Sequence, residues 1–175
     1  MSKHNTSSLG YLPIKNIDIL DSAINRTSNN NVIMPHVCDN INKFNSVFAK
    51  YLSSKYTYVK ENFHLLGKNA KLGYTQFVTI HNNKSTNNKV IVANMVAHNG
   101  LPNSSSERPL NYFFLCHCMN IINLKILDMF NNDNSSKVEI HAPRFGTGLS
   151  KGNWKFIEEL IKDIWASHSV FIYER

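Results

Sequence analysis

The sequence is short of the residues that mark several classes of protein. Its seven glycines in 175 residues are too few for a collagen-like repeat, and its three cysteines are an odd number that argues against a disulfide framework. No apolar run approaches the roughly 18 residues of a membrane span. The polar segment at 1–8 lacks the apolar stretch of a secretory signal. We therefore expect a cytoplasmic protein with no membrane partner.

The apolar content is high enough to build a core. Apolar residues make up 42% of the chain and aromatic residues 11%, which excludes a disordered chain. A length of 175 residues suits one domain rather than two. We expect a flexible tail at 1–8 followed by a single domain at 9–175.

Positive charge and asparagine are present in excess. Nineteen Lys and Arg against twelve Asp and Glu give a net charge of +7, which favours anionic partners such as phosphates and nucleotides. The 25 asparagines suggest an AT-rich genome, which supplies Lys and Asn whatever the function. Because the basic residues are scattered, binding of nucleic acid or poly-ADP-ribose is only an alternative, with a steep salt dependence as its signature.

Short β-like runs alternate with longer amphipathic stretches. Helices with one apolar face are expected at 44–52, at 109–129 and, with Asn153 as N-cap, at 153–165. Strands that alternate with such helices form a mostly parallel sheet. The expected fold class is α/β, a three-layer α/β/α domain with a mixed, mostly parallel sheet of about six strands. The expected strands are 17–20, 32–37, 75–80, 90–96, 138–142 and 169–173.

In such a sheet, ligands bind outside the carboxyl ends of the strands. The loop at 143–154 is the most informative of the loops at that edge, since it holds three of the seven glycines, Gly146, Gly148 and Gly152. Glycines let backbone amides approach an anion, and the following helix adds the positive end of its dipole. No Gly-Lys-Ser/Thr follows, so this is not a Walker loop. The pattern favours phosphate binding.

A metal site is not expected. Cys116, His117 and Cys118 are adjacent in an expected helix, where side chains two residues apart diverge by about 200 degrees and cannot share one ion. The cysteines are better explained as core residues. We expect no cofactor either, and the sequence contains no Gly-x-Ser-x-Gly elbow.

Five stretches, in order, resemble the macro domain, the ADP-ribose-binding module. More narrowly, they resemble its phage-type branch, which is related to the ADP-ribose-1″-phosphate phosphatases. The resemblance extends over residues 14–174 and implies a macro-type α/β/α domain. The stretches are IDILD at 17–21, IMPHVC at 33–38, LGYTQFV at 72–78, VANMV at 92–96, and HAPRFGTGL at 141–149 with GNW at 152–154.

The resemblance assigns roles to individual residues. It assigns Asp18 to the adenine amino group, although an Asp here could equally begin a helix. It implies that Tyr173 stacks on adenine, although a tyrosine at a strand end could instead pack on the core. The amides of 146–149 would bind the diphosphate and the distal ribose. The ligand-binding candidates are Asp18, Ile19, Asn40, Ser46, Val47, Phe48, Asn94, Arg144, Phe145, Gly146, Thr147, Gly148, Leu149 and Tyr173.

The first ligand loop departs from the family pattern. Three glycines of the relatives are replaced by Asn42, Asn45 and Val47. Asparagine tolerates left-handed backbone geometry, whereas valine does not. We expect the Val47 side chain to stand where a pyrophosphate or ribose usually approaches.

The asparagine that relatives place beside the distal ribose is Asp39 here. Three roles are open to it: a general base for water, a hydrogen-bond acceptor for two ribose hydroxyls, or a cap for the helix that begins near Phe44. We favour the second role, which predicts that ADP-ribose binds more tightly than ADP-ribose-1″-phosphate.

Catalysis is an open question in the sequence. His98 stands where related hydrolases carry a catalytic Lys, and Ser150 stands where they carry an Asp. Both changes argue against a Lys-dependent mechanism. His98 suits general acid–base chemistry, or is simply a solvent-side histidine. The expected function is binding of ADP-ribose or a related NAD-derived nucleotide, with Asp39 and His98 as catalytic candidates for hydrolysis of a terminal phosphate or an ADP-ribosyl bond. The alternative is an inactive nucleotide-binding module.

Overall fold

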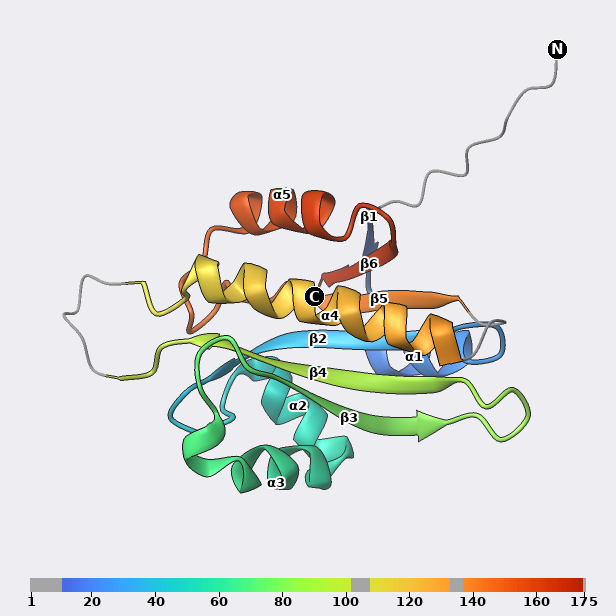
Figure 1. The fold of residues 1–175 in the computed structure, drawn as a ribbon, viewed down its shortest axis with the longest axis horizontal. Coiled ribbons are helices and arrows are strands. Elements are labelled where there is room, and N and C mark those ends of the chain that lie inside the picture. The colour runs from blue at the N-terminus through green and yellow to red at the C-terminus, as the bar shows by residue number, and fades with distance from the viewer. Residues whose placement is uncertain (1–10, 102–107, 133–136, 175) are drawn as a thin grey trace, which may run out of the picture.

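The structure, a computed structural model, describes residues 11–101, 108–132 and 137–174, and the tail expected at 1–8 lies outside them. Its centre is one sheet of six strands: β1 (Tyr11–Lys15), β2 (Asn31–Asp39), β3 (Thr75–Asn82), β4 (Lys89–His98), β5 (Val138–Pro143) and β6 (Ser169–Glu174). The spatial order is β1-β6-β5-β2-β4-β3 (Figure 1). Only the pair of β3 and β4 is antiparallel. This confirms the mixed, mostly parallel sheet.

Helices cover both faces of the sheet and complete three layers. One apolar cluster joins a face of the sheet to α4 (Tyr112–Asn132) and α5 (Trp154–Ile164). A second cluster joins the other face to α1 (Ile19–Arg26), α2 (Val47–Lys55) and α3 (Thr57–Leu65), which a short 3₁₀ helix at Gly67–Asn69 follows. Figure 1 shows α4 and α5 on the opposite side of the sheet from α2 and α3. The predicted α/β/α class is therefore confirmed.

The central strands are apolar because both of their faces are covered. All nine residues of β2 are buried, and so are the eight residues at 90–97 of β4. A strand buried on two faces reads as a continuous apolar run rather than an alternating one. These two strands could therefore be predicted from their apolar runs in the sequence.

Helix α4 is the most apolar helix in the described part of the chain. It is long and apolar enough to cross a membrane by length and composition alone. In the fold, one side of it packs on the sheet through Leu115, Cys118, Met119, Ile122 and Ile126.

The start of the described chain differs from the sequence prediction. We expected a strand at 17–20, but Asp18 is the N-cap of α1, where its carboxylate accepts hydrogen bonds from the amides of Leu20 and Asp21. Such a cap satisfies amide groups that a helix leaves without partners. The helix expected at 44–52 begins instead at Val47, because the Ser46 hydroxyl accepts the amide of Ala49.

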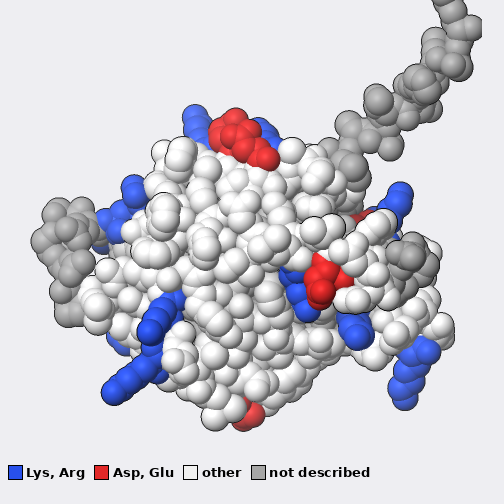
Figure 2. Space-filling view, viewed as in Figure 1, with Lys and Arg blue, Asp and Glu red and all other residues white. Residues whose placement is uncertain are grey.

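Charged side chains are dispersed on the face that Figure 2 shows. Lys and Arg lie apart from one another around a largely uncharged surface, with no continuous basic stripe on that face. This agrees with the scattered basic residues of the sequence.

Candidate functional site

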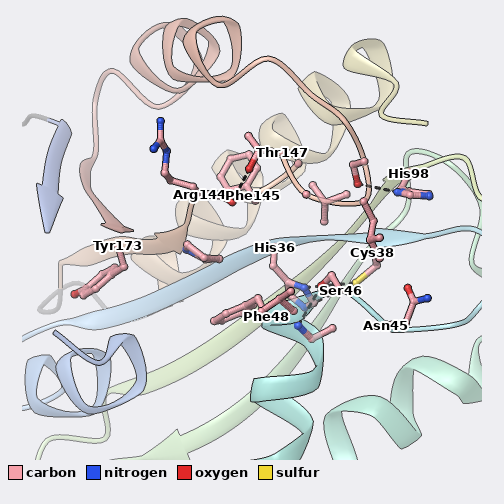
Figure 3. Close-up of a pocket in the computed structure, with 18 of the residues that line it drawn as sticks. His36, Cys38, Asn45, Ser46, Phe48, His98, Arg144, Phe145, Thr147 and Tyr173 are labelled. Atoms are coloured by element: carbon pink, nitrogen blue, oxygen red, sulfur yellow. Dashed lines mark hydrogen bonds between the residues drawn. The ribbon is translucent and has the colours of Figure 1, made fainter. Parts of the chain in front are cut away.

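A cavity of about 350 Å³ opens at the carboxyl ends of the parallel strands. Figure 3 shows Tyr173 at one end of it and His98 at the other, with Arg144 to Thr147 on one side and Ser46 and Phe48 on the other. The cavity is where a sheet of this topology is expected to bind a ligand. The predicted site residues that line it are Asp18, Ile19, Asp39, Ser46, Val47, Phe48, His98, Arg144, Phe145, Gly146, Thr147, Gly148, Leu149 and Tyr173.

Two predicted ligand-binding residues, Asn40 and Asn94, do not line the cavity. Asn94 is fully buried, and its side chain hydrogen-bonds His36 at 2.6 Å and Gln76 at 3.0 Å. Asn40 does not line the cavity: its Oδ1 accepts the amide of Gly100 at 2.8 Å, and its Nδ2 donates to Asn99 at 3.2 Å. Both side chains therefore stabilise the protein around the cavity through hydrogen bonds.

At one end of the cavity, Asp18 is both a helix cap and a cavity residue. Its Oδ1 accepts the amides of Leu20 and Asp21 at 2.9 and 3.1 Å, and its Oδ2 accepts the hydroxyl of Tyr51. A carboxylate has about four acceptor positions, so one position on Oδ2 remains. Burial raises the pKa of Asp18, but the hydrogen bonds from Tyr51 and the two amides outweigh it, and the net pKa is lowered.

Tyr173 packs in the core, as its second alternative predicted, and stacking on adenine stays a prediction. It is only 6% exposed and packs in the core cluster, yet it also lines the cavity. Its hydroxyl contacts Ser22 Oγ at 2.6 Å and His141 Nδ1 at 2.7 Å. Burial raises the pKa of Tyr173. The hydroxyl is therefore committed to the protein, and the ring is the part that the cavity receives.

The first loop is organised by Asp39. Its Oδ1 accepts the amides of Ile41 and Lys43 at 3.1 and 2.9 Å, and its Oδ2 accepts the amide of Phe44 at 3.1 Å. These bonds hold a loop in which Asn42 and Phe44 have positive φ angles of 62° and 52°. Left-handed geometry is expected for asparagine and uncommon for phenylalanine. These contacts are closest to the third alternative, a carboxylate that caps backbone amides, and they leave Oδ2 one acceptor position, as on Asp18.

Val47 does not fill the cavity. It is the first residue of α2, borders the opening and is 71% exposed. Ser46 caps this helix, so the positive end of the helix dipole faces the cavity edge. Val47 therefore lies at the opening of the cavity, and its place in the path of a ligand stays a prediction.

The second loop is held by its first and last glycines. The amide of Gly152 donates to the carbonyl of Gly146 at 2.7 Å, and Gly146 has a φ of 76° that a side chain would strain. A Cβ at Gly148 would meet no atom within 4 Å. Asn153 accepts the amide of Phe156 at 3.4 Å, which confirms it as the N-cap of α5. Gly148 thus lies where the backbone is open to an approaching ligand.

His98 and Ser150 meet at the far end of the cavity. The Nδ1 of His98 lies 2.7 Å from Ser150 Oγ, and both residues line the cavity. Burial lowers the pKa of His98, while the nearby Asp39 carboxylate acts in the opposite direction. A neutral imidazole can accept a proton at neutral pH.

The floor of the cavity contains two residues that the sequence analysis did not place in the site. His36 and Cys38 lie on the same face of β2, with Cys38 Sγ 3.8 Å from the His36 ring nitrogens. His36 also meets the rings of Phe44 and Phe48 edge-on, at 5.5 and 5.3 Å between centroids. The signal that could have found them is the period of two along a strand whose carboxyl end meets the site.

Comparison with known proteins supports the fold. No family model and no curated protein matches the chain. A solved protein of unknown function from Bacteroides thetaiotaomicron is 25% identical, with 95% of this chain and 98% of that chain covered and a TM-score of 0.76. A macrodomain protein from Streptomyces coelicolor is 18% identical, with 95% and 99% covered and a TM-score of 0.71.

A third structure contains a ligand. It is DarTG from Thermosipho africanus in complex with ADP-ribose, which is 11% identical to this chain, with 94% of this chain and 42% of that chain covered and a TM-score of 0.64. At this level of identity the likeness concerns the fold. The chain has the three-layer fold of the macrodomains, and its cavity lies at the carboxyl edge of that fold.

Proposed function

We propose that the cavity binds ADP-ribose or a related adenine nucleotide derived from NAD. The observation that carries this proposal is the layout of the cavity, with Tyr173 at one end and His98 at the other. Asp18 lies at the Tyr173 end, because it caps the helix whose Ser22 bonds Tyr173, and Ser150 lies at the His98 end through its contact with His98. A ligand with a base, a diphosphate and a second ribose has the same linear order of parts. The ADP-ribose complex of the DarTG neighbour supports this assignment.

The Asp18 end suits adenine. The free acceptor position on Asp18 Oδ2 can take a hydrogen from the adenine amino group, whereas it would repel the O6 of guanine. The Tyr173 ring supplies an apolar surface for the base.

The middle of the cavity suits a diphosphate. The N-terminus of α2, capped by Ser46, contributes the positive end of a helix dipole. The open backbone around Gly148 allows amides to approach the anion closely. Arg144 lines the cavity and is 3.7 Å from Glu174, so its charge is partly neutralised. We therefore assign anion binding mainly to backbone amides.

Hydrolysis is the second candidate function, and the His98–Ser150 contact favours it. In this proposal His98 takes a proton from water, and the water oxygen attacks the terminal phosphorus as its bond to the ribose oxygen breaks. The protonated His98 then gives its proton to the ribose oxygen, so that inorganic phosphate and ADP-ribose are released. We assign the base role to His98 rather than to Asp39, because three amide hydrogen bonds hold the Asp39 carboxylate to the first loop. Activity on ADP-ribose-1″-phosphate would favour the phosphatase-like branch of the family.

Calorimetry tests the binding proposal. ADP-ribose should bind more tightly than AMP, which lacks the second phosphate and ribose, and more tightly than GMP. A wild-type protein that binds no adenine nucleotide would overturn the proposal. A steep loss of affinity with salt for a single-stranded oligonucleotide would favour the nucleic-acid alternative.

Turnover is tested separately, with release of inorganic phosphate from ADP-ribose-1″-phosphate and of ADP-ribose from a modified protein as the readouts. Binding without either release would favour the inactive module. If turnover occurs, His98→Gln should remove it while leaving ADP-ribose affinity within about threefold.

A further inference from the structure

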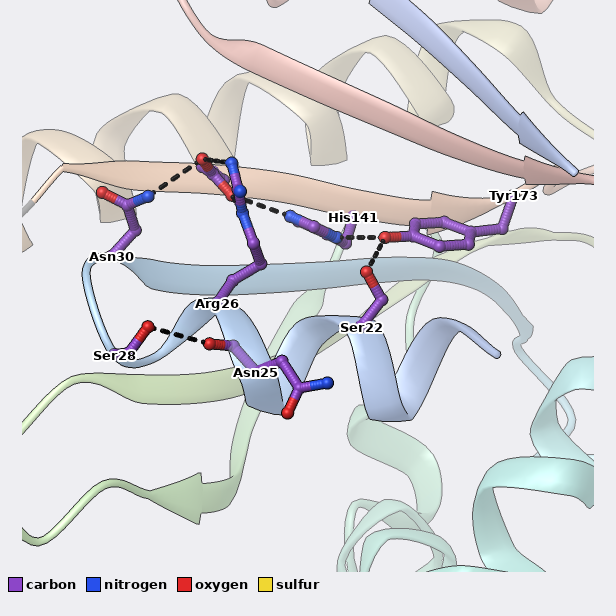
Figure 4. Close-up of polar contacts among 8 residues, drawn as sticks. Ser22, Asn25, Arg26, Ser28, Asn30, His141 and Tyr173 are labelled. Carbon is purple, nitrogen blue, oxygen red and sulfur yellow. Dashed lines mark hydrogen bonds and ion pairs between the residues drawn. The ribbon is translucent and has the colours of Figure 1, made fainter. Parts of the chain in front are cut away.

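A polar cluster that begins at Tyr173 lies between α1 and the strands β5 and β6 (Figure 4). At its centre is Glu139 of β5, which is only 6% exposed. Arg26 contacts both of its oxygens, with Nε 2.8 Å from Oε2 and Nη2 2.6 Å from Oε1, and Asn30 donates to Oε1 at 2.9 Å. A buried carboxylate is stable only with such partners. The buried Glu139 carboxylate is thus fully supported by charged and polar partners.

The Glu139 carboxylate determines which ring nitrogen of His141 carries the proton. Burial raises the pKa of Glu139, but hydrogen bonds from His141 and Arg26 outweigh it and lower the pKa to about 2, so Glu139 is ionised and only accepts. Burial lowers the pKa of His141, and this effect outweighs the opposite effect of the Glu139 carboxylate, so the net pKa is lowered. The imidazole is therefore neutral at pH 7. Its Nε2 lies 3.0 Å from Glu139 Oε2 and must carry the single proton.

The remaining nitrogen sets the direction of the last two hydrogen bonds. Because Nδ1 of His141 carries no proton, it accepts the hydroxyl proton of Tyr173 across 2.7 Å. The Tyr173 oxygen is then free to accept from Ser22 Oγ across 2.6 Å. Ser22 lies one turn after Asp18 on α1. The hydroxyl thus joins the helix that carries Asp18 to the strand that carries Tyr173.

We propose that His141 is a positioning residue of the nucleotide site: it anchors the Tyr173 hydroxyl outside the cavity and so fixes the orientation of the ring that meets the ligand's base. This inference rests on the proposed function. The His141 and Tyr173 rings are inclined by 29° with centroids 5.7 Å apart, and His141 is stacked on Phe171 at 4.6 Å. The imidazole is therefore fixed by Phe171 as well as by Glu139.

Two substitutions of His141 separate a positioning role from a merely structural one. Asparagine places an oxygen near the position of Nδ1 and can still accept from Tyr173, but it loses the contact with Glu139. Glutamine places an NH₂ near the position of Nε2 and can still donate to Glu139, but it offers Tyr173 no acceptor. We expect His141→Asn to keep ADP-ribose affinity within twofold and His141→Gln to lower it at least fivefold.

A double-mutant cycle tests whether His141 acts through the tyrosine hydroxyl. Tyr173→Phe should lower affinity by the same factor as His141→Gln, and the double variant should lose no more than either alone. The matched control is His168→Asn, at a half-buried histidine that contacts Asn123 and does not line the cavity. Equal losses for His141→Asn and His141→Gln, or losses that add in the double variant, would overturn the proposal.

A spectroscopic measurement needs no ligand. The ¹⁵N shifts of the His141 ring in the free protein should show a protonated Nε2 and an unprotonated Nδ1. If ADP-ribose binds the wild type but Nδ1 carries the proton, the positioning role fails while the proposed function stands. If no adenine nucleotide binds the wild type, the proposed function fails, and the positioning role fails with it.

Discussion

His98 Nδ1 lies 2.7 Å from Ser150 Oγ, and this contact joins the carboxyl end of β4 to the loop that follows β5. The two strands are not neighbours in the sheet, since β2 lies between them. The contact therefore spans the cavity at its far end. It limits how far the two sides of the cavity can separate there.

Loss of this contact should weaken the fold measurably. Ser150 is only 8% exposed, and a hydrogen bond of this kind contributes about 1 kcal/mol to stability. We expect Ser150→Ala to lower the free energy of unfolding by about that amount, measured by chemical denaturation. Ser53, whose hydroxyl bonds the Lys50 carbonyl on the surface of α2, is the matched control. A Ser150→Ala variant as stable as Ser53→Ala would contradict the assignment.

The second loop offers a test of anion binding that leaves the fold intact. A Cβ at Gly148 meets nothing within 4 Å, so Gly148→Val should retain the wild-type melting temperature. Its side chain should nevertheless block the ligand and lower ADP-ribose affinity at least tenfold, which is about 1.4 kcal/mol. Gly152→Ala is the contrast, because its Cβ would lie 2.5 Å from the Gly146 carbonyl and should destabilise the protein. Unchanged affinity of Gly148→Val would move the anion site elsewhere.

Asp18 has two roles that separate substitutions can distinguish. Asp18→Ala removes the cap of α1 and should cost about 1 kcal/mol of stability. Asp18→Ser keeps a capping oxygen for the amides of Leu20 and Asp21 but removes the carboxylate. We expect both variants to lose the preference for adenine over guanine nucleotides, and only the alanine variant to lose stability. Equal weakening for both bases would leave Asp18 with the structural role alone.

The sequence predicted the sheet better than its surroundings. Strands β2, β4, β5 and β6 are buried, so they leave apolar runs that are easy to locate. The edge strand β1 was missed because only Tyr11 and Ile14 are even partly buried there. Helix α3 was missed because it buries only Val59 and Phe63. The error at 17–20 arose because the alternation of IDIL is typical of a strand, whereas the Asp18 cap decides the structure.

Site residues in the loops were predicted, because the loops carry a recognisable pattern. Site residues on the strands were missed. Gly146 and Gly148 of the second loop lie in the cavity wall, whereas Gly152 does not line it. His36 lines the cavity and the predicted Asn94 does not, although the two side chains lie on neighbouring strands in register and bond each other at 2.6 Å. Which member of such a pair reaches the cavity depends on the tertiary arrangement. The role of Asp39 likewise depends on a loop path that spacing alone does not fix.

Asp39→Asn tests the loop assignment. An amide has one acceptor oxygen where the carboxylate has two, so at least one of the three amides at Ile41, Lys43 and Phe44 would face an NH₂ group. A buried donor left without a partner costs about 1–3 kcal/mol. We expect this substitution to lower stability within that range and to weaken binding of ADP-ribose and ADP-ribose-1″-phosphate by similar factors. A stable variant that reverses the preference between the two ligands would restore the ribose-binding role.

The fully buried His36 should make stability fall in mild acid. Burial lowers its pKa from an ordinary value near 6.5 to about 4, against the weaker opposing effect of the hydrogen bond with Asn94. Because the unfolded chain binds the proton more readily, the stabilisation is complete above pH 6.5 and is lost as the pH falls towards 4. A shift of this size corresponds to a loss on the order of 3 kcal/mol. His36→Gln keeps a donor for Asn94 and removes the titration, so it should flatten the dependence of unfolding free energy on pH between 6.5 and 4. His117→Gln, on the exposed side of α4, is the control, and equal slopes for His36→Gln and the wild type would show that the acid sensitivity comes from other groups.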